Sequence, residues 1–225
     1  MDEEQPVDPT GMTARVTYDA PPLREDAIAS APLEQFRRWF QDAAAQLPEP
    51  NAMTLATVGS GGPTARVVLA KSVSASGVTF FTNLTSAKAR DITTDDRVAL
   101  VFAWLPLHRQ VRMVGRAEQV STAESNEYFA TRPREAQLGA WASSQSREVT
   151  IDQLNDRYQA FERRYPVGRT VPRPDHWGGY LVRPRVIEFW QGQPSRLHDR
   201  LVFTASREPA RLDEAQAWNV RRLCP

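Results

Sequence analysis

Short runs in which hydrophobic and polar residues alternate fill most of the chain after residue 50. Each run ends at glycine, proline or small polar residues, which is the pattern of half-buried β-strands joined by turns. Residues 97–104 are apolar almost throughout and predict a strand buried on both faces. Several short strands at close spacing favour a barrel or a sandwich. The alternation predicts strands at residues 53–58, 64–71, 78–82, 109–120, 178–182, 185–191, 201–204 and 218–223.

A second pattern, with apolar residues three and four positions apart, marks the helices. Residues 32–47 are expected to form an amphipathic helix with an aromatic stripe, and residues 86–94 a short one. Two capping-box patterns, at 121–124 and 150–153, and a proline at position 133 predict three more helices. Because these helices interrupt the strands, we predict a mainly β fold with α (α+β), in which one barrel carries a helical insertion and an N-terminal helix.

The first 30 residues follow neither pattern. They are rich in proline, aspartate and glutamate, so we expect residues 1–30 to be a mobile N-terminal arm. Residues 31–225 contain no internal repeat and no break in composition. We therefore predict a single domain over residues 31–225.

Composition narrows the class of protein. The chain is 41% hydrophobic and 24% charged, which is ordinary for a globular protein, and its net charge of +1 gives no reason to expect a nucleic-acid partner. The longest apolar run, 98–107, is too short to span a membrane, and the acidic N-terminus does not resemble a signal peptide. One cysteine and three scattered histidines predict neither a disulfide nor a metal site. We expect a cytoplasmic protein.

The clearest chemical signal lies near the C-terminus, at residues 187–200. An aromatic run there ends at a Gly-Gln-Pro turn, and Arg196, His198 and Arg200 follow at alternate positions. In an extended chain these three side chains would face one side, beside Trp190, and would suit an anionic or electron-rich ligand. The alternative is a solvated basic strand end.

Other polar residues suggest phosphate sites. Arg66 and Lys71 are an odd number of positions apart, so in a regular strand they face opposite sides. Residues 82–88 run from a strand into a helix start with hydroxyls and a lysine, which suits a phosphate group, although a serine-capped helix explains the same residues. Tyr128 and Arg132 are helical neighbours that can contact one ligand, or Arg132 can belong to a surface ion-pair cluster.

The remaining polar residues also suit ligand binding rather than catalysis by side chains. Small polar groups occupy 143–146, and Gln110 can contact the polar edge of a ring or pair on the sheet surface. No Ser/His/Asp arrangement, acid–base pair or dinucleotide fingerprint is present. This profile fits an enzyme whose cofactor carries the reaction.

Taken in order, these segments resemble the pyridoxamine 5′-phosphate oxidases, which are FMN enzymes of vitamin B6 metabolism. The resemblance covers the chain from about residue 32 to 225 and is most specific in Glu-Phe-Trp-Gln-Gly at 188–192 and Arg-Leu-His-Asp-Arg at 196–200. Further matching runs are 51–53, 56–58, 66–71, 80–83, 109–111, 128–129, 132–134, 137–141, 145–146 and 177–179.

The resemblance implies an FMN-binding split β-barrel, an obligate homodimer and FMN at the dimer interface. By motif position, the FMN site is expected to contain Arg66, Val67, Lys71, Phe81, Thr82, Lys88, Gln110, Gln145, Ser146, Trp190 and Arg200. The residues expected to bind substrate are Lys71, Tyr128, Arg132, Arg196 and His198, with Arg196 and His198 as the catalytic pair. Arg15 and Tyr18 resemble an N-terminal pair that covers the site.

The implied reaction is oxidation of pyridoxamine or pyridoxine 5′-phosphate to pyridoxal 5′-phosphate, with O2 as acceptor and H2O2 as by-product. The chain departs from the family at Ala87, where an arginine is frequent, and at Ala136, where a serine is frequent. The alternatives are a related phenazine-type flavin oxidase, a flavin reductase, or a non-enzymatic binder of FMN or pyridoxal phosphate. Lys71 and the run 132–141 favour the B6 reaction over the phenazine type.

Overall fold

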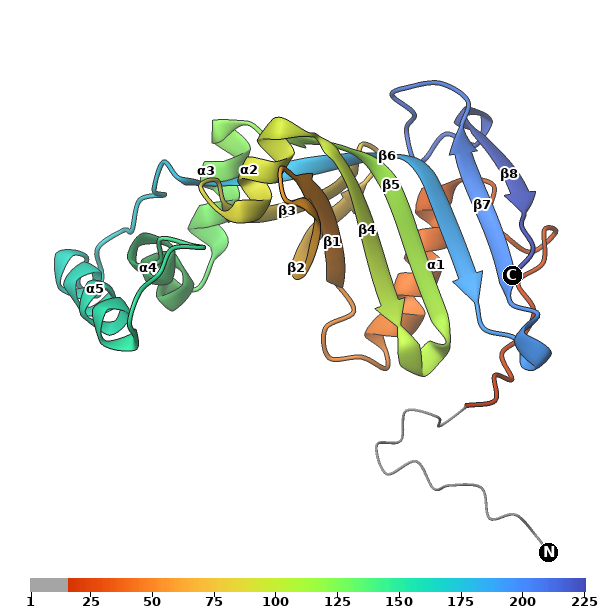
Figure 1. Cartoon of the computed structure of the whole chain (residues 1–225), viewed down its shortest axis with the longest axis horizontal. Coiled ribbons are helices and arrows are strands. Elements are labelled where there is room, and N and C mark those ends of the chain that lie inside the picture. Colours follow the sequence, from red (N-terminus) through yellow and green to blue (C-terminus); the bar gives the residue numbers. More distant parts are fainter. Residues whose placement is uncertain (1–15) are drawn as a thin grey trace, which may run out of the picture.

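The computed structural model describes residues 16–225, and the predicted contact of Arg15 lies outside them. These residues form five α-helices and eight β-strands (Figure 1). The helices are α1 (Pro32–Ala44), α2 (Ala87–Thr94), α3 (Thr122–Thr131), α4 (Arg134–Ala142) and α5 (Ile151–Arg164). The strands are β1 (Ala52–Gly59), β2 (Gly62–Ser74), β3 (Gly77–Asn83), β4 (Arg97–Trp104), β5 (Arg109–Gln119), β6 (Trp177–Gln191), β7 (Asp199–Ala205) and β8 (Trp218–Arg222).

Six of the strands close into an antiparallel barrel. Their order is β3-β2-β1-β4-β5-β6, and β3 pairs with the first part of β6 to complete the ring. The second part of β6 leaves the ring and carries β7 and β8 on its free side (Figure 1). The predicted α+β barrel, split where β6 changes neighbours, is therefore confirmed.

Strand 97–104 is buried on one face only, so the sequence-based prediction of two buried faces is wrong. Val98, Leu100 and Phe102 are at most 4% exposed and point into the barrel, while Ala99 and Val101 between them are only partly buried. The apolar outer residues are small, and such side chains hide the alternation that a half-buried strand normally shows.

Residues 178–182 and 185–191 belong to one long strand, although Pro184 between them suggested two. A β-bulge absorbs the break: Gly115 of β5 faces Pro184, and the register then shifts so that Val114 faces Val186. A Cβ at Gly115 would lie 2.1 Å from the carbonyl oxygen of Arg183, so only glycine allows this close approach. The strand that closes the barrel and the strand that carries β7 are thereby one rigid element.

The helices pack in two places. Helix α1 lies against the barrel, where Phe36 contacts Phe102 and Trp39 contacts Phe189. Helices α3 to α5 lie between β5 and β6 in sequence and build a second, smaller apolar cluster around Phe129. The capping box at 150–153 is confirmed, with both of its hydrogen bonds present. The helical insertion thus lies to one side of the barrel, with α3 next to α2 and β3 (Figure 1).

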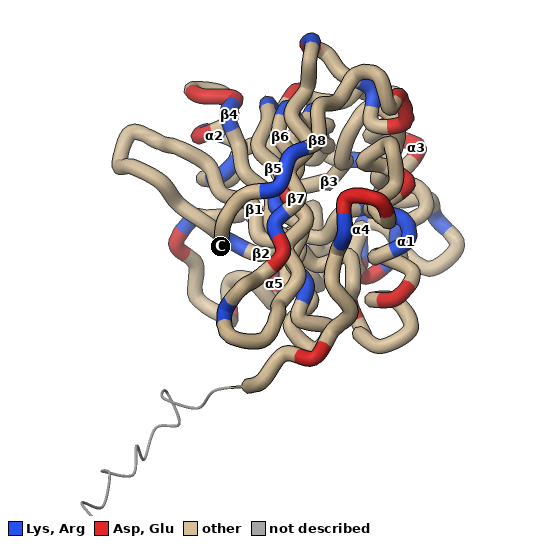
Figure 2. Tube along the Cα trace, turned by 90° about the vertical axis from the view of Figure 1, so that its right-hand side faces the viewer, with Lys and Arg blue, Asp and Glu red and all other residues tan. Residues whose placement is uncertain are grey.

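Residues 16–30 lie against the C-terminal strands. The backbone N–H of Leu23 donates to Asp199 at 2.9 Å, and Arg222 donates to the carbonyl of Leu23 and to Glu25. Basic positions gather along β7 and β8 at this place (Figure 2). The mobile arm over residues 1–30 stays a prediction, and its first half lies outside the described residues.

Candidate cofactor and substrate site

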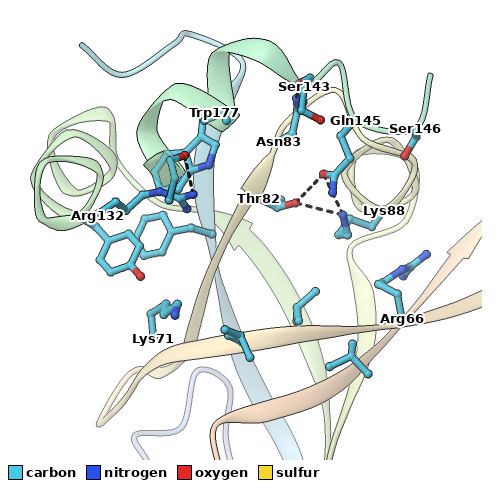
Figure 3. Close-up of a pocket in the computed structure, with 18 of the residues that line it drawn as sticks. Arg66, Lys71, Thr82, Asn83, Lys88, Arg132, Ser143, Gln145, Ser146 and Trp177 are labelled. Carbon is cyan, nitrogen blue, oxygen red and sulfur yellow. Dashed lines mark hydrogen bonds between the residues drawn. The ribbon is translucent and has the colours of Figure 1, made fainter. Parts of the chain in front are cut away.

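A cleft of about 840 Å³ opens between the barrel strands β2 and β3 and the helices α2 to α4. Four cationic side chains line it, and the described residues that form its walls include no aspartate or glutamate. Figure 3 shows Arg132 and Lys71 at one end of the cleft and Lys88 and Arg66 at the other. A cleft with this charge attracts a ligand with negative groups at both ends.

Lys88 is the most deeply buried of the four cations, at 7% exposure. Its Nζ donates to Thr82 Oγ1 at 3.1 Å and to Gln145 Oε1 at 3.3 Å (Figure 3). Burial, and next to it the charge of Arg66, lowers the pKa of Lys88. A buried cation is normally paired with an anion, and here all its contacts are neutral, so an anionic ligand would complete the site.

Ion pairing separates Arg66 from the other three cations. None of the ion pairs among residues 16–225 includes Lys71, Lys88 or Arg132. Arg66 alone lies near a carboxylate, with 3.7 Å between its Nη2 and Asp91 Oδ2. Its guanidinium also donates to the hydroxyls of Thr57, at 2.6 Å, and Thr64 and to the backbone carbonyl of Leu55, and these contacts fix its position at the rim.

Arg66 and Lys71 both line the cleft, although regular alternation would place them on opposite faces of β2. The reason is a bulge: Ala70 pairs with Phe80 and Ser72 with Thr79, which leaves Lys71 as an extra residue without a partner. The irregular register changes the direction of the Lys71 side chain. The expectation of opposite faces is therefore wrong, and the two cations act on one cavity.

Arg132 lies over the Trp177 ring, with 4.8 Å from its guanidinium carbon to the ring centroid. Its Nη2 donates to the Ala136 carbonyl at 3.0 Å, and its Nε is buried without a hydrogen-bond partner among residues 16–225. Burial lowers the pKa of Arg132, although Tyr128 acts against that shift. An unsatisfied buried donor on a cation is a strong indication of a missing anionic partner.

Three aromatic rings form a flat wall beside Arg132. Phe81 and Tyr128 stack at 4.1 Å between centroids, and Trp177 is nearly parallel to both. Offset stacking holds such rings rigid and presents a smooth apolar surface. The wall suits a planar ligand that carries a negative group near Arg132.

The loop after α4 brings its polar groups to the start of α2. Thr82 Oγ1 donates to Gln145 Oε1 at 3.3 Å, and the backbone N–H of Ala87 donates to Ser146 Oγ at 3.2 Å. Ser146 adopts a left-handed backbone conformation with φ of 66°. Residues about 60 positions apart in the chain therefore meet beside Lys88 and the start of α2.

Ten of the predicted site residues line this cleft. They are Arg66, Val67, Lys71, Phe81, Thr82, Lys88, Tyr128, Arg132, Gln145 and Ser146.

Gln110, Trp190 and Arg200 lie elsewhere, in one row across β5, β6 and β7. Gln110 pairs with Trp190, and Trp190 pairs with Arg200. The next row, Val111 with Phe189 and Leu201, is completely buried in the barrel core. Because neighbouring side chains on a strand alternate, the row of Gln110, Trp190 and Arg200 faces outward.

Arg196 lines a second hollow of about 510 Å³ at the end of this row, together with Trp190, Gln110 and Tyr18. The expected extended segment is wrong here: residues 194–196 form a 3₁₀ turn, and Ser195 and Arg196 have positive φ angles of 55° and 62°. The turn carries Arg196 to the exposed rim, where strand alternation no longer determines its direction.

His198 is held by the same turn. Its Nδ1 accepts the backbone N–H of Gln193 at 3.1 Å, so the neutral ring carries its proton on Nε2. Burial, followed by the charge of Arg196, lowers the pKa of His198, and Asp199 acts against this shift. Within the described part of the chain the Nε2–H of His198 has no acceptor, which leaves this proton for a ligand.

Tyr18 covers this second group of residues. The centroid of its ring lies 4.5 Å from that of His108, 5.5 Å from that of His198 and 6.2 Å from that of Trp190. Gly192 makes room for it, since a Cβ there would lie 2.9 Å from the Tyr18 ring. His108 was not predicted as a site residue, although it directly precedes the matching run 109–111 that contains Gln110.

The chain therefore divides the predicted residues between two places. The structure does not bring Gln110, Trp190, Arg196, His198 and Arg200 into the cleft that holds the other ten. Trp177 and Asn83, which the sequence-based site omitted, do line that cleft. An aromatic residue directly before Gly178-Gly179 was the signal for Trp177, because glycine lets another group approach closely.

The two departures from the family both lie in the cleft wall. Ala87 lies at the first turn of α2, and the carbonyl of Ala136 accepts from Arg132. Neither side chain can donate a hydrogen bond to a phosphate, and Lys88 and Arg132 are cations that line the same cleft. No group of three or more His, Cys, Asp or Glu side chains that could hold a metal ion occurs in residues 16–225. Within the same residues, no helix is long and apolar enough to cross a membrane.

Comparison with known proteins gives two family matches. Residues 40–164 match the family described as pyridoxamine 5′-phosphate oxidase, and residues 177–225 match the pyridoxine 5′-phosphate oxidase C-terminal dimerisation region. The chain is 51% identical over 213 residues to a pyridoxine/pyridoxamine 5′-phosphate oxidase of Bordetella pertussis, covering 94% of this chain and 97% of that protein. It is 50% identical over 214 residues to the protein of the same name from Cupriavidus necator, with the same coverage.

Solved structures agree with the fold. PhzG from Burkholderia lata, crystallised with tetrahydrophenazine-1-carboxylic acid, superposes with a TM-score of 0.82 at 28% identity, covering 93% of this chain and all of PhzG. An FMN-binding protein related to pyridoxamine 5′-phosphate oxidase, from Nostoc punctiforme, gives a TM-score of 0.67 at 17% identity, covering 88% of this chain and all of that protein, and supports the fold alone.

Proposed function

The chain belongs to the pyridoxamine 5′-phosphate oxidase family, and on this premise we propose that it oxidises pyridoxamine or pyridoxine 5′-phosphate to pyridoxal 5′-phosphate with FMN and O2. H2O2 is the expected by-product. The reaction is part of vitamin B6 biosynthesis and salvage, and we propose that it takes place in the cytoplasm.

One observation carries the proposal: the cleft has two cationic ends and no carboxylate (Figure 3). Lys88 and Arg66 at one end suit the phosphate of FMN, and Lys71 and Arg132 at the other suit the phosphate of the substrate. A site for a single phosphate would need only one of these ends. The lone buried Nε of Arg132 and the uncompensated charge of Lys88 fit a pair of phosphorylated ligands.

When bound, FMN would supply the two-electron oxidation that no side chain can perform. The chain's own residues then bind and orient. Thr82 and Gln145 accept hydrogen bonds from Lys88 and fix its position, and Ser146 accepts from the backbone of the preceding Ala87. The rings of Phe81, Tyr128 and Trp177 form an apolar wall that excludes water from one side of the cleft. Holding the reactants in a fixed geometry is the main contribution of such a site.

Arg196 and His198 are proposed to hold the reacting end of the substrate. Arg196 supplies a planar cation at the rim of the second hollow, and His198 presents Nε2–H as a donor because Gln193 occupies Nδ1. At neutral pH His198 is uncharged, since its pKa is lowered. It thus donates a hydrogen bond without adding a further positive charge beside Arg196.

These residues reach the cleft only if two chains associate. We propose an obligate homodimer in which the outward row of Gln110, Trp190 and Arg200 of one subunit completes the cleft of the other. The match of residues 177–225 to a dimerisation region supports this arrangement, because the row lies partly in that region. Sedimentation velocity at working concentration tests it: an FMN-loaded monomer would contradict the proposal.

The function is tested by adding pyridoxamine 5′-phosphate to the FMN-loaded protein without oxygen. Loss of the oxidised flavin absorbance, with one pyridoxal 5′-phosphate formed per flavin, is the expected result. Bleaching by NADPH instead would indicate a flavin reductase. An FMN-loaded protein that neither substrate bleaches would indicate a binding protein.

A phenazine-type oxidase is the second candidate, because the fold superposes closely on PhzG. The two functions differ in their need for a second phosphate site. Lys71 and Arg132 favour the phosphorylated B6 substrate. Equal kcat/KM for pyridoxamine with and without its phosphate would remove that support, and turnover of a reduced phenazine carboxylate would then favour the alternative.

A further inference from the structure

Glu188 is a buried carboxylate that the proposed reaction does not use. It lies on β6 at 4% exposure, on the outward face of the sheet, two residues before Trp190. Its oxygens accept from two arginines on the neighbouring strands. Arg112 Nη2 of β5 donates to Oε2 at 2.8 Å, and Arg200 of β7 donates through Nη2 to Oε2 at 2.9 Å and through Nε to Oε1 at 3.3 Å.

The contact with Arg200 is a fork in which two N–H groups of the guanidinium meet both carboxylate oxygens. A third N–H, on Nη1, donates to the backbone carbonyl of Cys224 at 2.9 Å. A guanidinium has five N–H groups, so these three hydrogen bonds leave two for another partner. These contacts within the chain therefore determine both the plane of the Arg200 guanidinium and the direction in which its two remaining N–H groups point.

The charges explain why the carboxylate stays ionised. Burial alone would raise the pKa of Glu188, but the hydrogen bonds from Arg200 and Arg112 outweigh it, and the pKa is lowered. Of the two cations, Arg200 belongs to the row with Trp190 and Gln110, whereas Arg112 pairs with Glu188 itself, two rows along the sheet. Because Glu188 pairs with two arginines, its single negative charge does not fully neutralise Arg200. Arg200 therefore retains a net positive charge that can attract a ligand.

We propose that Glu188 is a positioning residue, which orients the Arg200 guanidinium beside Trp190 so that its two remaining N–H groups face bound FMN. Glu188 itself does not touch the ligand. This inference rests on the proposed FMN function. It differs from a purely structural role, in which Glu188 would only neutralise buried charge and its loss would change stability alone.

The test is FMN affinity, measured by quenching of flavin fluorescence on titration of the FMN-free dimer. Glu188→Gln keeps the shape of the side chain and removes its charge, and we expect the dissociation constant for FMN to rise about tenfold. Glu118→Gln is the matched control. Glu118 pairs with Arg183 at the other end of the β5–β6 pair, so its loss should leave FMN affinity within about twofold.

A double-mutant cycle identifies the route of the effect. If Glu188 acts through Arg200, Glu188→Gln should add little to Arg200→Met, and the two losses of affinity should not multiply. Multiplying losses, or an unchanged affinity in a folded Glu188→Gln dimer, would overturn the inference. If Glu188→Gln does not fold, Glu188→Asp replaces it: its shortened carboxylate should weaken FMN binding severalfold, and wild-type affinity would count against the proposal.

Failure of the proposed function is recognised separately. A wild-type dimer that binds no FMN would refute the cofactor assignment before any variant is compared. A wild-type dimer that binds FMN while Glu188→Gln binds it equally well would refute only the role of Glu188.

Discussion

The guanidinium carbon of Arg132 lies 4.8 Å from the centroid of the Trp177 ring, at one end of the cleft, while Arg132 Nε has no hydrogen-bond partner within residues 16–225. The cation–π contact takes the place that a carboxylate usually holds beside a buried arginine. Arg132 is consequently fixed in position and still free to bind an anion.

Replacing Arg132 tests this end of the cleft. Arg132→Met should lower kcat/KM for pyridoxamine 5′-phosphate by about 10²–10³, mainly through KM, because a charge-assisted contact to the substrate phosphate is lost. FMN affinity should stay within about twofold. Arg163→Met, on the exposed side of α5, is the control and should match the wild type. An unchanged KM in Arg132→Met would show that the substrate phosphate binds elsewhere.

Lys88 should make FMN binding sensitive to alkaline pH. Its pKa is lowered from 10.5 by burial and by Arg66, so the cation loses its proton earlier than an exposed lysine does as pH rises. FMN affinity should therefore fall before pH 10.5 is reached. In Lys88→Arg the charge persists, and the affinity should be flat over the same range. Titrations of both proteins, with circular dichroism to confirm folding, would disprove the assignment if their pH profiles coincide.

Arg196 should be needed for turnover but not for cofactor binding. Arg196→Met should reduce kcat/KM by about 10²–10³ while FMN stays bound, because a positioned charged donor is lost. Arg196→Lys should restore only part of the rate, since a point charge lacks the planar fork. Arg185→Met, an exposed cation on β6, provides the comparison. Near-normal kcat/KM in Arg196→Met would mean that the turn is only structural.

His198 should produce an acidic limb in the pH profile of kcat/KM. The neutral ring accepts from Gln193, and protonation of Nδ1 as pH falls would break that hydrogen bond. Because its pKa is lowered from 6.5, the midpoint of this decline should lie below that pH. His198→Asn can still accept from Gln193 but cannot titrate, so this limb should be absent. The same limb in both proteins would assign it to another group.

Gly192→Ala tests whether the packing of Tyr18 against Gly192 affects substrate binding. The added Cβ would lie 2.9 Å from the Tyr18 ring and 3.1 Å from the Cβ of His108, so the ring must move. We expect KM for the substrate to rise about three- to tenfold with little change in FMN affinity. Gly61→Ala is the control, because its Cβ would meet no atom within 4 Å. Equal KM values in the two variants would exclude a role for the docked Tyr18.

Much of the fold was predictable because local patterns and tertiary structure agree. The alternation in 109–120 reports a strand with one face in the core, and the capping residues at 150–153 mark the start of α5 within one residue. Prediction failed where the decisive contact is distant in sequence. The bulge at Pro184 depends on Gly115 of another strand, and alternation alone does not report it.

Sequence reasoning named many of the residues that line the cleft but not how they are arranged. The resemblance named ten residues that line one cleft, yet Lys71 reaches it through a bulge that sequence spacing contradicts. Arg196 was expected on an extended segment and lies instead on a turn with positive φ. Glu188, the buried partner of Arg200, opens the matching run 188–192 but was given no role there, because a glutamate within an apolar strand also fits an exposed position.

The pairing of β3 with β6 also determines the order in which the molecule can be built. Val78 meets Val182 only after about 100 further residues, including all of the helical insertion, have been synthesised. Until then the nascent chain carries five strands with unpaired edges on β3 and β5, which are the edges that invite association between chains. Pairing between strands so distant in sequence forms slowly. The nascent chain is therefore prone to aggregation until β6 has been synthesised and covers the edges of β3 and β5.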